Sequence, residues 1–196
     1  MFDCRHRPLA LPDDLAAQLA AAYGEPHRAY HDATHIAELL GWFDRVADDV
    51  GWHRPAEVYA AIVFHDAVYE PGAKDNEARS ATWARRAGLP VDADRVAELI
   101  LMTASHGANH AADHDAALFL DSDMAVIGAP AEAFARYDAA IASEYAAIPR
   151  ELYRRKRREF LERLLQLPRI FLTDYFHARL DTQARANLSA ALAVAQ

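Results

Sequence analysis

One histidine and one aspartate lie next to each other at the end of a segment that is expected to be buried. His65 and Asp66 directly follow the apolar run 60–64, which reads as a well-buried helix. Burying an imidazole and a carboxylate is unfavourable unless both groups have partners. A metal cation can serve as the partner of both, since histidine nitrogens and carboxylate oxygens are common metal ligands.

Two other places in the chain offer ligands of the same kinds. His35 opens an expected helix, and Asp121 and Asp123 follow the apolar run 116–120. Two imidazoles, Asp66 and one of these two aspartates would suit a divalent transition metal, whereas an all-oxygen set would suit Mg or Ca. Four protein ligands leave coordination positions open for water and substrate, as in a catalytic site. The competing interpretation is a buried hydrogen-bonded network without an ion.

Helical patterns account for nearly the whole chain. Apolar residues recur at spacings of three and four, and proline, glycine and capping residues separate the segments. The expected helices cover 12–22, 35–50, 55–66, 76–87, 92–103, 113–127, 130–146, a segment that begins near 149, and 188–194. We find no alternating strand pattern, internal repeat or linker, so we expect one all-α domain over 1–196. Its motif-bearing core covers about 25–130, and its C-terminal helices cover about 130–196.

Composition limits the classes of function. The chain of 196 residues is 53% hydrophobic and carries a formal net charge of −8, which argues against binding a nucleic-acid polymer. A local group of arginines can still hold a small anion.

The single cysteine of the chain, Cys4, cannot form an intramolecular disulfide. We find neither an apolar signal segment nor a membrane span, and we expect a cytoplasmic protein. The alanine-rich final helices can pack on the core or on a second copy, so a homodimer stays open.

Four segments of the chain form one set of motifs: YHDATHI at 30–36, FHDAVY at 64–69, NEARSA at 76–81 and FLDSDMAVIG at 119–128. Together they resemble the HD-domain metal-dependent phosphohydrolases, in particular an uncharacterised bacterial branch of that superfamily. The resemblance covers about residues 25–190. It implies an all-helical bundle of the HD-domain type, a bound divalent metal, and hydrolysis of a phosphate ester of a small compound, with a nucleotide as the favoured substrate.

The resemblance also implies a ligand set. The positions that match the family's metal ligands are His35, His65, Asp66 and Asp123. Asp121 then supports the helix or the ligands. Some relatives hold two metals through additional histidines. Here the further histidines, which are His106, His110 and His114, lie close together in the sequence. We therefore expect one ion, chosen among Mn, Co, Ni, Zn and Fe.

The expected mechanism is attack of a metal-bound hydroxide on phosphorus, with arginines holding the remaining phosphate charge. The residues expected to act in catalysis are Asp66, Glu70, Glu77 and His106. Those expected to bind the substrate are Arg28, His31, Tyr69, Asn76, Arg150 and Arg154. In some relatives an acid follows the His-Asp pair by three residues, whereas here Tyr69 has that spacing and Glu70 comes one later. Arg28→Ala is expected to raise the substrate KM more than it lowers metal content.

Several of these residues have simpler interpretations. The arginines of 150–158 can form a solvated helix face paired with Glu151 and Glu159, and Glu77 can merely favour the start of its helix. The function has two alternatives as well. One is an oxygen-activating iron oxidoreductase of the same framework, and the other is a non-catalytic module that binds metal and nucleotide.

Overall fold

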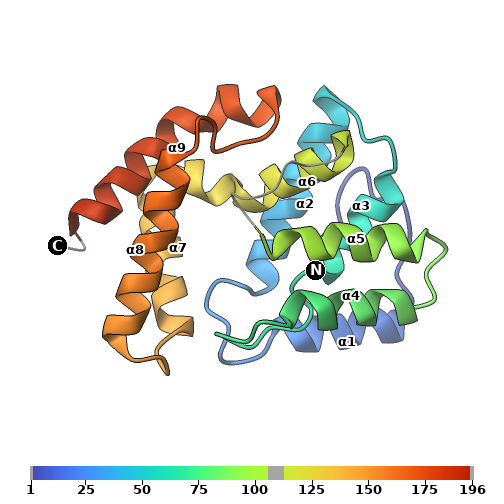
Figure 1. Cartoon of the computed structure of the whole chain (residues 1–196). Helices are drawn as coiled ribbons and strands as arrows, with labels where there is room; N and C mark the ends of the chain where they lie inside the picture. The colour runs from blue at the N-terminus through green and yellow to red at the C-terminus, as the bar shows by residue number, and fades with distance from the viewer. Residues whose placement is uncertain (1, 106–112, 195–196) are drawn as a thin grey trace.

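The computed structural model describes residues 2–105 and 113–194, and every regular element in these ranges is a helix. The elements in chain order are α1 (Asp13–Tyr23), α2 (Ala33–Asp49), α3 (Pro55–Phe64), α4 (Asn76–Arg86), α5 (Ala93–Thr103), α6 (His114–Met124), the 3₁₀ turn η1 (Ala125–Gly128), α7 (Ala131–Glu144), α8 (Arg150–Gln166) and α9 (Asp174–Val194) (Figure 1). The predicted all-α fold is confirmed. No described helix has the length and apolar character needed to cross a membrane.

Helix α3 lies at the centre of the N-terminal part. Its residues from Val58 to Phe64 are all fully buried. A helix that is apolar on every side must be surrounded, and α3 packs against α2, α4, α5 and α6. The burial of α3 explains how His65, the next residue, comes to be only 1% exposed.

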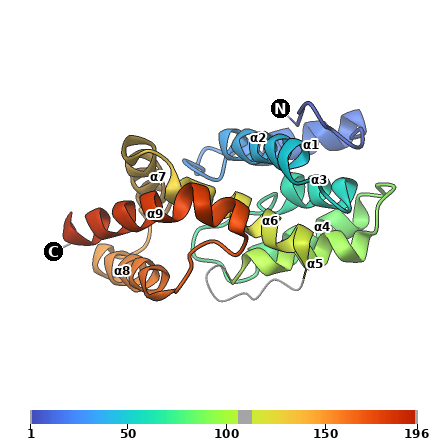
Figure 2. The same ribbon diagram turned by 90° about the horizontal axis from the view of Figure 1, so that it is seen from above.

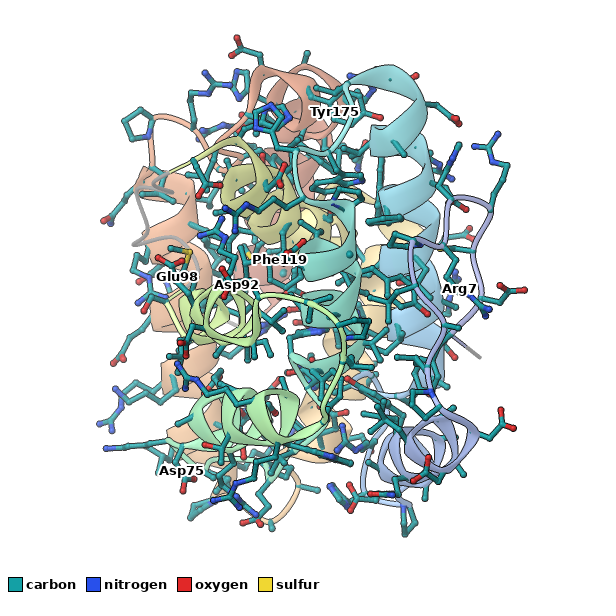
Figure 3. The ribbon with its side chains drawn as sticks, turned by 90° about the vertical axis from the view of Figure 1, so that its right-hand side faces the viewer. Arg7, Asp75, Asp92, Glu98, Phe119 and Tyr175 are labelled. Carbon is teal, nitrogen blue, oxygen red and sulfur yellow. The ribbon has the colours of Figure 1, made fainter. Side chains whose placement is uncertain are left out.

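The buried side chains form two clusters, and α6 joins them. The first cluster lies among α1 to α5 and includes Phe119 of α6, whereas the second lies among η1, α7, α8 and α9 and includes Leu118. Figure 2 shows α7, α8 and α9 to one side of α1 to α5, with α6 between the two groups. In Figure 3, Phe119 lies in the interior, while Arg7 and Asp75 lie at the periphery. Helix α6 therefore carries Asp123 to the boundary between the two clusters.

Helix α2 begins two residues earlier than expected. Asp32 is its N-cap, because the carboxylate accepts hydrogen bonds from the backbone N–H groups of Thr34 and His35. A carboxylate is a good acceptor at this position. The earlier start leaves His35 within the first turn.

The last helix is also longer than expected, since α9 has 21 residues where we expected a helix only over 188–194. Its N-terminal half is rich in polar residues, so its apolar positions are easily overlooked. Phe176, Ala184 and Leu188 are buried in the second cluster, and Leu180 packs against it. These positions are four residues apart, which places them on one face of a helix. That face lies against η1.

Candidate metal centre

Four side chains from three helical regions converge on one point. The Nε2 atom of His35 lies 3.2 Å from Nε2 of His65, 3.1 Å from a carboxylate oxygen of Asp123 and 3.6 Å from one of Asp66. Nε2 of His65 lies 3.0 Å from the Asp66 oxygen and 3.5 Å from the Asp123 oxygen. The structure thus brings together all four of the predicted ligands, and we call this group the His/Asp cluster.

Each member is held by its local structure. His35 projects from the first turn of α2, and Asp123 from the last turn of α6. His65 caps the end of α3, and its Nδ1 lies 2.9 Å from the carbonyl oxygen of Ile62. That carbonyl can only accept a hydrogen bond, so Nδ1 carries a proton and, in the neutral ring, Nε2 presents its lone pair to the cluster.

The spacing of these atoms fits a coordinated cation. Metal–ligand distances of roughly 2.0–2.2 Å for nitrogen and oxygen place neighbouring ligand atoms roughly 3.0–3.6 Å apart. The five separations above lie in that range. Among the residues that the structure describes, His35, His65 and Asp66 are the one group of three such ligands that meets the geometric requirement for a metal. Asp123 is not a member of that group, although its carboxylate lies within 3.5 Å of both imidazoles.

The electrostatics of the cluster favour positive charge. Burial alone would lower the pKa of His65, but the carboxylates of Asp66 and Asp123 outweigh burial and raise that pKa well above its usual value. Burial would raise the pKa of Asp66, yet His65 and His31 hold it below its usual value. The imidazole side is closed, whereas the Asp66 and Asp123 side chains keep 16% and 10% of their surface exposed. A ligand can therefore approach from the carboxylate side.

Asp121 takes no part in the cluster. Two residues apart on a helix means about 200° of rotation, so Asp121 and Asp123 point in nearly opposite directions. The buried Asp121 carboxylate accepts hydrogen bonds from the backbone N–H groups of Leu172 and Thr173 and from the Thr173 hydroxyl. Burial raises its pKa to about 6, although these hydrogen bonds oppose the shift. Asp121 thus anchors the chain that enters α9.

Arg28 does not fit the predicted role in phosphate binding. Its side chain has no exposed surface. The guanidinium donates to the carbonyl oxygens of His31, Asp66 and Ala67 and to the Glu25 carboxylate. These partners leave it no open approach for a substrate phosphate. Arg28 instead ties the loop before α2 to the backbone of a predicted metal ligand.

His31 and Tyr69 meet at a carboxylate that the sequence analysis did not identify. Glu144, the last residue of α7, accepts from the backbone N–H groups of Ala29, Tyr30 and His31 through one oxygen. Its other oxygen lies 2.7 Å from Nδ1 of His31 and accepts from the Tyr69 hydroxyl at 2.8 Å. Burial would raise the pKa of Glu144, but the contacts with His31 and the backbone N–H groups lower it to about 2. The Tyr69 hydroxyl is therefore already engaged, which argues against its predicted contact with substrate.

His31 lies between Glu144 and the cluster. Its ring centroid is 5.9 Å from that of His35 and 4.2 Å from that of Tyr69. Burial would lower the pKa of His31, but Asp66 and Glu144 raise it, which favours the protonated form. The His31 side chain is 20% exposed, so a ligand at the cluster can reach it.

The predicted site residues that follow the His-Asp pair in the sequence make contacts that stabilise the fold. The Glu70 carboxylate pairs with Arg79 at the surface, at 2.9 Å. The Asn76 side chain binds the backbone N–H and carbonyl of Glu70 and so closes the loop 70–76. Glu77 is half-buried in the first turn of α4, and no described contact joins it to the cluster. None of these contacts supports the predicted roles of Glu70 and Glu77 in catalysis or of Asn76 in substrate binding.

The remaining predicted residues lie elsewhere. Arg150 and Arg154 are exposed on α8, and Arg154 pairs with Glu151 at 3.7 Å. Helix α8 lies beside α9 and away from α3 in both views (Figures 1 and 2). His114 contacts the carbonyl of Gly51. The predicted catalytic role of His106 falls outside the described residues.

One pattern in the sequence could have revealed Glu144. In α7, Phe134, Tyr137, Ile141 and Glu144 follow one another at spacings of three and four, and the first three are buried or half-buried. An acidic residue on the apolar stripe of a helix must find partners inside the protein. The sequence does not show that those partners are the residues just before α2.

Comparison with known proteins adds nothing to this description, since no family model, no curated protein and no solved structure matches the chain.

Proposed function

We propose that this protein is a divalent-metal-dependent phosphohydrolase that acts on a small phosphorylated compound, with a nucleotide as the favoured class. One observation carries the proposal. Two imidazoles and the Asp66 carboxylate meet at metal-like spacing, and the Asp123 carboxylate lies 3.1 Å from Nε2 of His35, in a site that is closed on the imidazole side and open on the carboxylate side. The resemblance of the surrounding motifs to HD-domain phosphohydrolases supports the reaction class.

The cation would be held by His35, His65, Asp66 and Asp123. When bound, it would lower the pKa of a coordinated water and offset the charge on a phosphoryl oxygen. The protein fixes this arrangement before substrate binds, because the Asp66 backbone is held by Arg28 and the His65 ring by the Ile62 carbonyl. Rigid placement of ligands is what a catalytic site requires.

His31 is the residue of this chain best placed to act on the substrate. Glu144 holds the ring through Nδ1 and favours its protonated form. A cationic imidazole beside the cluster attracts a phosphate group and can donate a proton to the leaving oxygen. In this proposal His31 replaces Arg28 as the cation that meets the substrate, and Glu144 positions it.

The decisive experiment compares metal content and phosphate release for wild type, Asp66→Ala and Asp123→Asn. A panel of nucleotides and phosphodiesters is supplied with Mn, Co, Ni, Zn or Mg, and bound metal is measured by elemental analysis. We expect about one ion per wild-type chain and turnover in the panel. Both variants should lose metal and turnover while their circular dichroism stays helical.

Asp121→Asn is the matched control, since it changes the neighbouring aspartate on the same helix. It should lower stability and leave the metal content of the folded protein unchanged. Full metal occupancy in Asp66→Ala would contradict the ligand assignment. A metal-loaded wild type that hydrolyses nothing in the panel would contradict the proposed reaction and favour a binding module. Oxygen consumption by an iron-loaded protein would favour the oxidoreductase.

A further inference from the structure

A groove with a volume of about 770 Å³ runs between α2 and α7. Gly41, Trp42 and Arg45 of α2 line one wall, and Arg136 and Tyr137 of α7 line the other. Residues of η1 and Leu180 of α9 also line the groove. A groove of this volume can hold a ligand of nucleotide size.

Gly41 leaves space on the α2 wall of the groove. No neighbouring element packs so closely against it that a side chain would be excluded. It lies in the middle of a helix of 17 residues, where glycine is unfavourable relative to alanine. A Cβ atom added there would meet no atom of another element within 4 Å. By contrast, a Cβ at Gly128 would lie 2.5 Å from Cβ of Leu180. The space beside Gly41 is therefore part of the groove, because no other helix packs against this position.

The groove offers rings and two arginines, and the carboxylates of Asp32 and Glu38 also line it, Asp32 as the N-cap of α2. The Arg45 guanidinium lies over the Trp42 ring, 4.6 Å from its centroid. Neither Arg45 nor Arg136 forms an ion pair with a described residue, although many other arginines of this chain do. Arginines that lack a carboxylate partner in an acidic protein are suited to binding an external anion.

The groove is separate from the opening of the His/Asp cluster. Of the four cluster residues only His35 lines it, and Tyr30 packs between His35 and Tyr137 with centroid distances of 4.7 and 4.6 Å. Arg45 follows His35 by two to three helical turns, or roughly 15 Å along the axis. A phosphate held at Arg45 is thus too far from the cluster to be the one that reacts.

We propose that this groove is a second ligand site that binds a planar anion, meaning an aromatic ring that carries a phosphate group, as in a nucleoside monophosphate. The ring lies in the space before Gly41, between the α2 and α7 walls. The phosphate contacts Arg45 and Arg136. His35 also lines the groove.

The test measures binding of AMP to the metal-stripped full-length chain in EDTA, so that it does not depend on the proposed hydrolysis. Adenosine and inorganic phosphate are the partial probes. We expect saturable binding of AMP by wild type, with weaker binding of either partial probe. Gly41→Trp fills the groove and should weaken AMP binding by at least about tenfold. Arg45→Ala combined with Arg136→Ala should weaken AMP binding more than adenosine binding.

Three controls isolate the groove. Gly41→Ala should bind AMP as wild type does, because a methyl group leaves most of the space. Ala139→Trp places the same large ring on an exposed position of α7 that does not line the groove, and it should also bind normally. Asp66→Ala should keep AMP binding in EDTA. The proposal is overturned if metal-stripped wild type shows no saturable AMP binding, or if Gly41→Trp remains folded and binds AMP with wild-type affinity.

Discussion

The Glu144 carboxylate joins the loop before α2 to His31 and Tyr69. Its two oxygens accept from three consecutive backbone N–H groups, from the His31 ring and from the Tyr69 hydroxyl. A buried carboxylate with several donors is strongly stabilised in its ionised form. Glu144 therefore acts on both the stability of the fold and the orientation of His31.

The pKa of Glu144 gives a prediction for the pH dependence of stability. Because its pKa is lowered from 4.5 to about 2, its contribution is present above pH 4.5 and is lost as the pH falls towards 2. That contribution is of order 3 kcal/mol. Glu144→Gln should lower the free energy of unfolding by about that amount at pH 7 and by much less near pH 2. Urea denaturation of both proteins at the two pH values measures the difference, and an equal loss at both would contradict the assignment.

The buried position of Arg28 reverses the expectation for its substitution. Arg28→Ala would leave the carbonyl oxygens of Asp66 and Ala67 without their donor and should lower the free energy of unfolding by about 2–4 kcal/mol. Metal content should fall as well, since the Asp66 backbone is no longer held. Arg154→Ala on the exposed face of α8 is the control and should change stability by less than about 0.5 kcal/mol. Denaturation and elemental analysis test both; a raised KM with wild-type stability would restore the phosphate-binding role.

At the scale of elements, two glycines of similar appearance in the sequence have different roles. Gly128 ends η1 where this turn packs against α9, and the contact leaves no room for a Cβ atom. Gly41 faces the groove. The close approach at Gly128 helps the second cluster to form, whereas the space at Gly41 is available to a ligand.

Alanine at each glycine should therefore have opposite effects on stability. Gly128→Ala forces η1 away from Leu180 and should lower the free energy of unfolding by about 1–3 kcal/mol. Gly41→Ala should raise it by about 0.5–1 kcal/mol, because alanine favours the helix and meets no neighbour. Thermal denaturation of the two variants beside wild type provides the comparison. A Gly128→Ala protein as stable as wild type would mean that η1 and α9 pack less closely than described.

At the scale of the whole molecule, the His/Asp cluster joins parts of the chain that belong to different packing groups. His35 and His65 come from helices of the first buried cluster, and Asp123 comes from the end of α6, which contributes to both clusters. A cation bound there would link these parts in the folded state only. Binding would then stabilise the entire fold by mass action.

Removal of metal tests this linkage. At a metal concentration of 100 times Kd, binding stabilises a protein by about 2.7 kcal/mol, which raises the Tm of a chain of this size by about 5–10 °C. We expect wild type with Mn or Zn to melt higher than wild type in EDTA by that amount. Asp66→Ala should melt at the same temperature in both conditions. A shift of equal size in the variant would place the bound metal elsewhere.

The amino-acid sequence alone was sufficient for the all-α fold and for His35, His65 and Asp66 of the His/Asp cluster. Both follow from local regularities, since helical periodicity groups apolar residues on one face and shows which polar residues would be buried with them. The choice of Asp123 over Asp121 came from the resemblance to HD-domain phosphohydrolases. The sequence also placed most helix ends to within a few residues. It missed most of α9, where apolar positions four apart are separated by polar residues.

Only the tertiary structure decided which partner each polar residue meets. Asp121 and Asp123 are alike in the sequence, but the rotation of α6 directs one towards α9 and the other towards the imidazoles. Glu144 meets residues more than 100 positions earlier in the chain, as the separation of 113 from His31 shows. Such pairings depend on how distant helices pack, and helix packing is not encoded in the spacing of neighbouring residues.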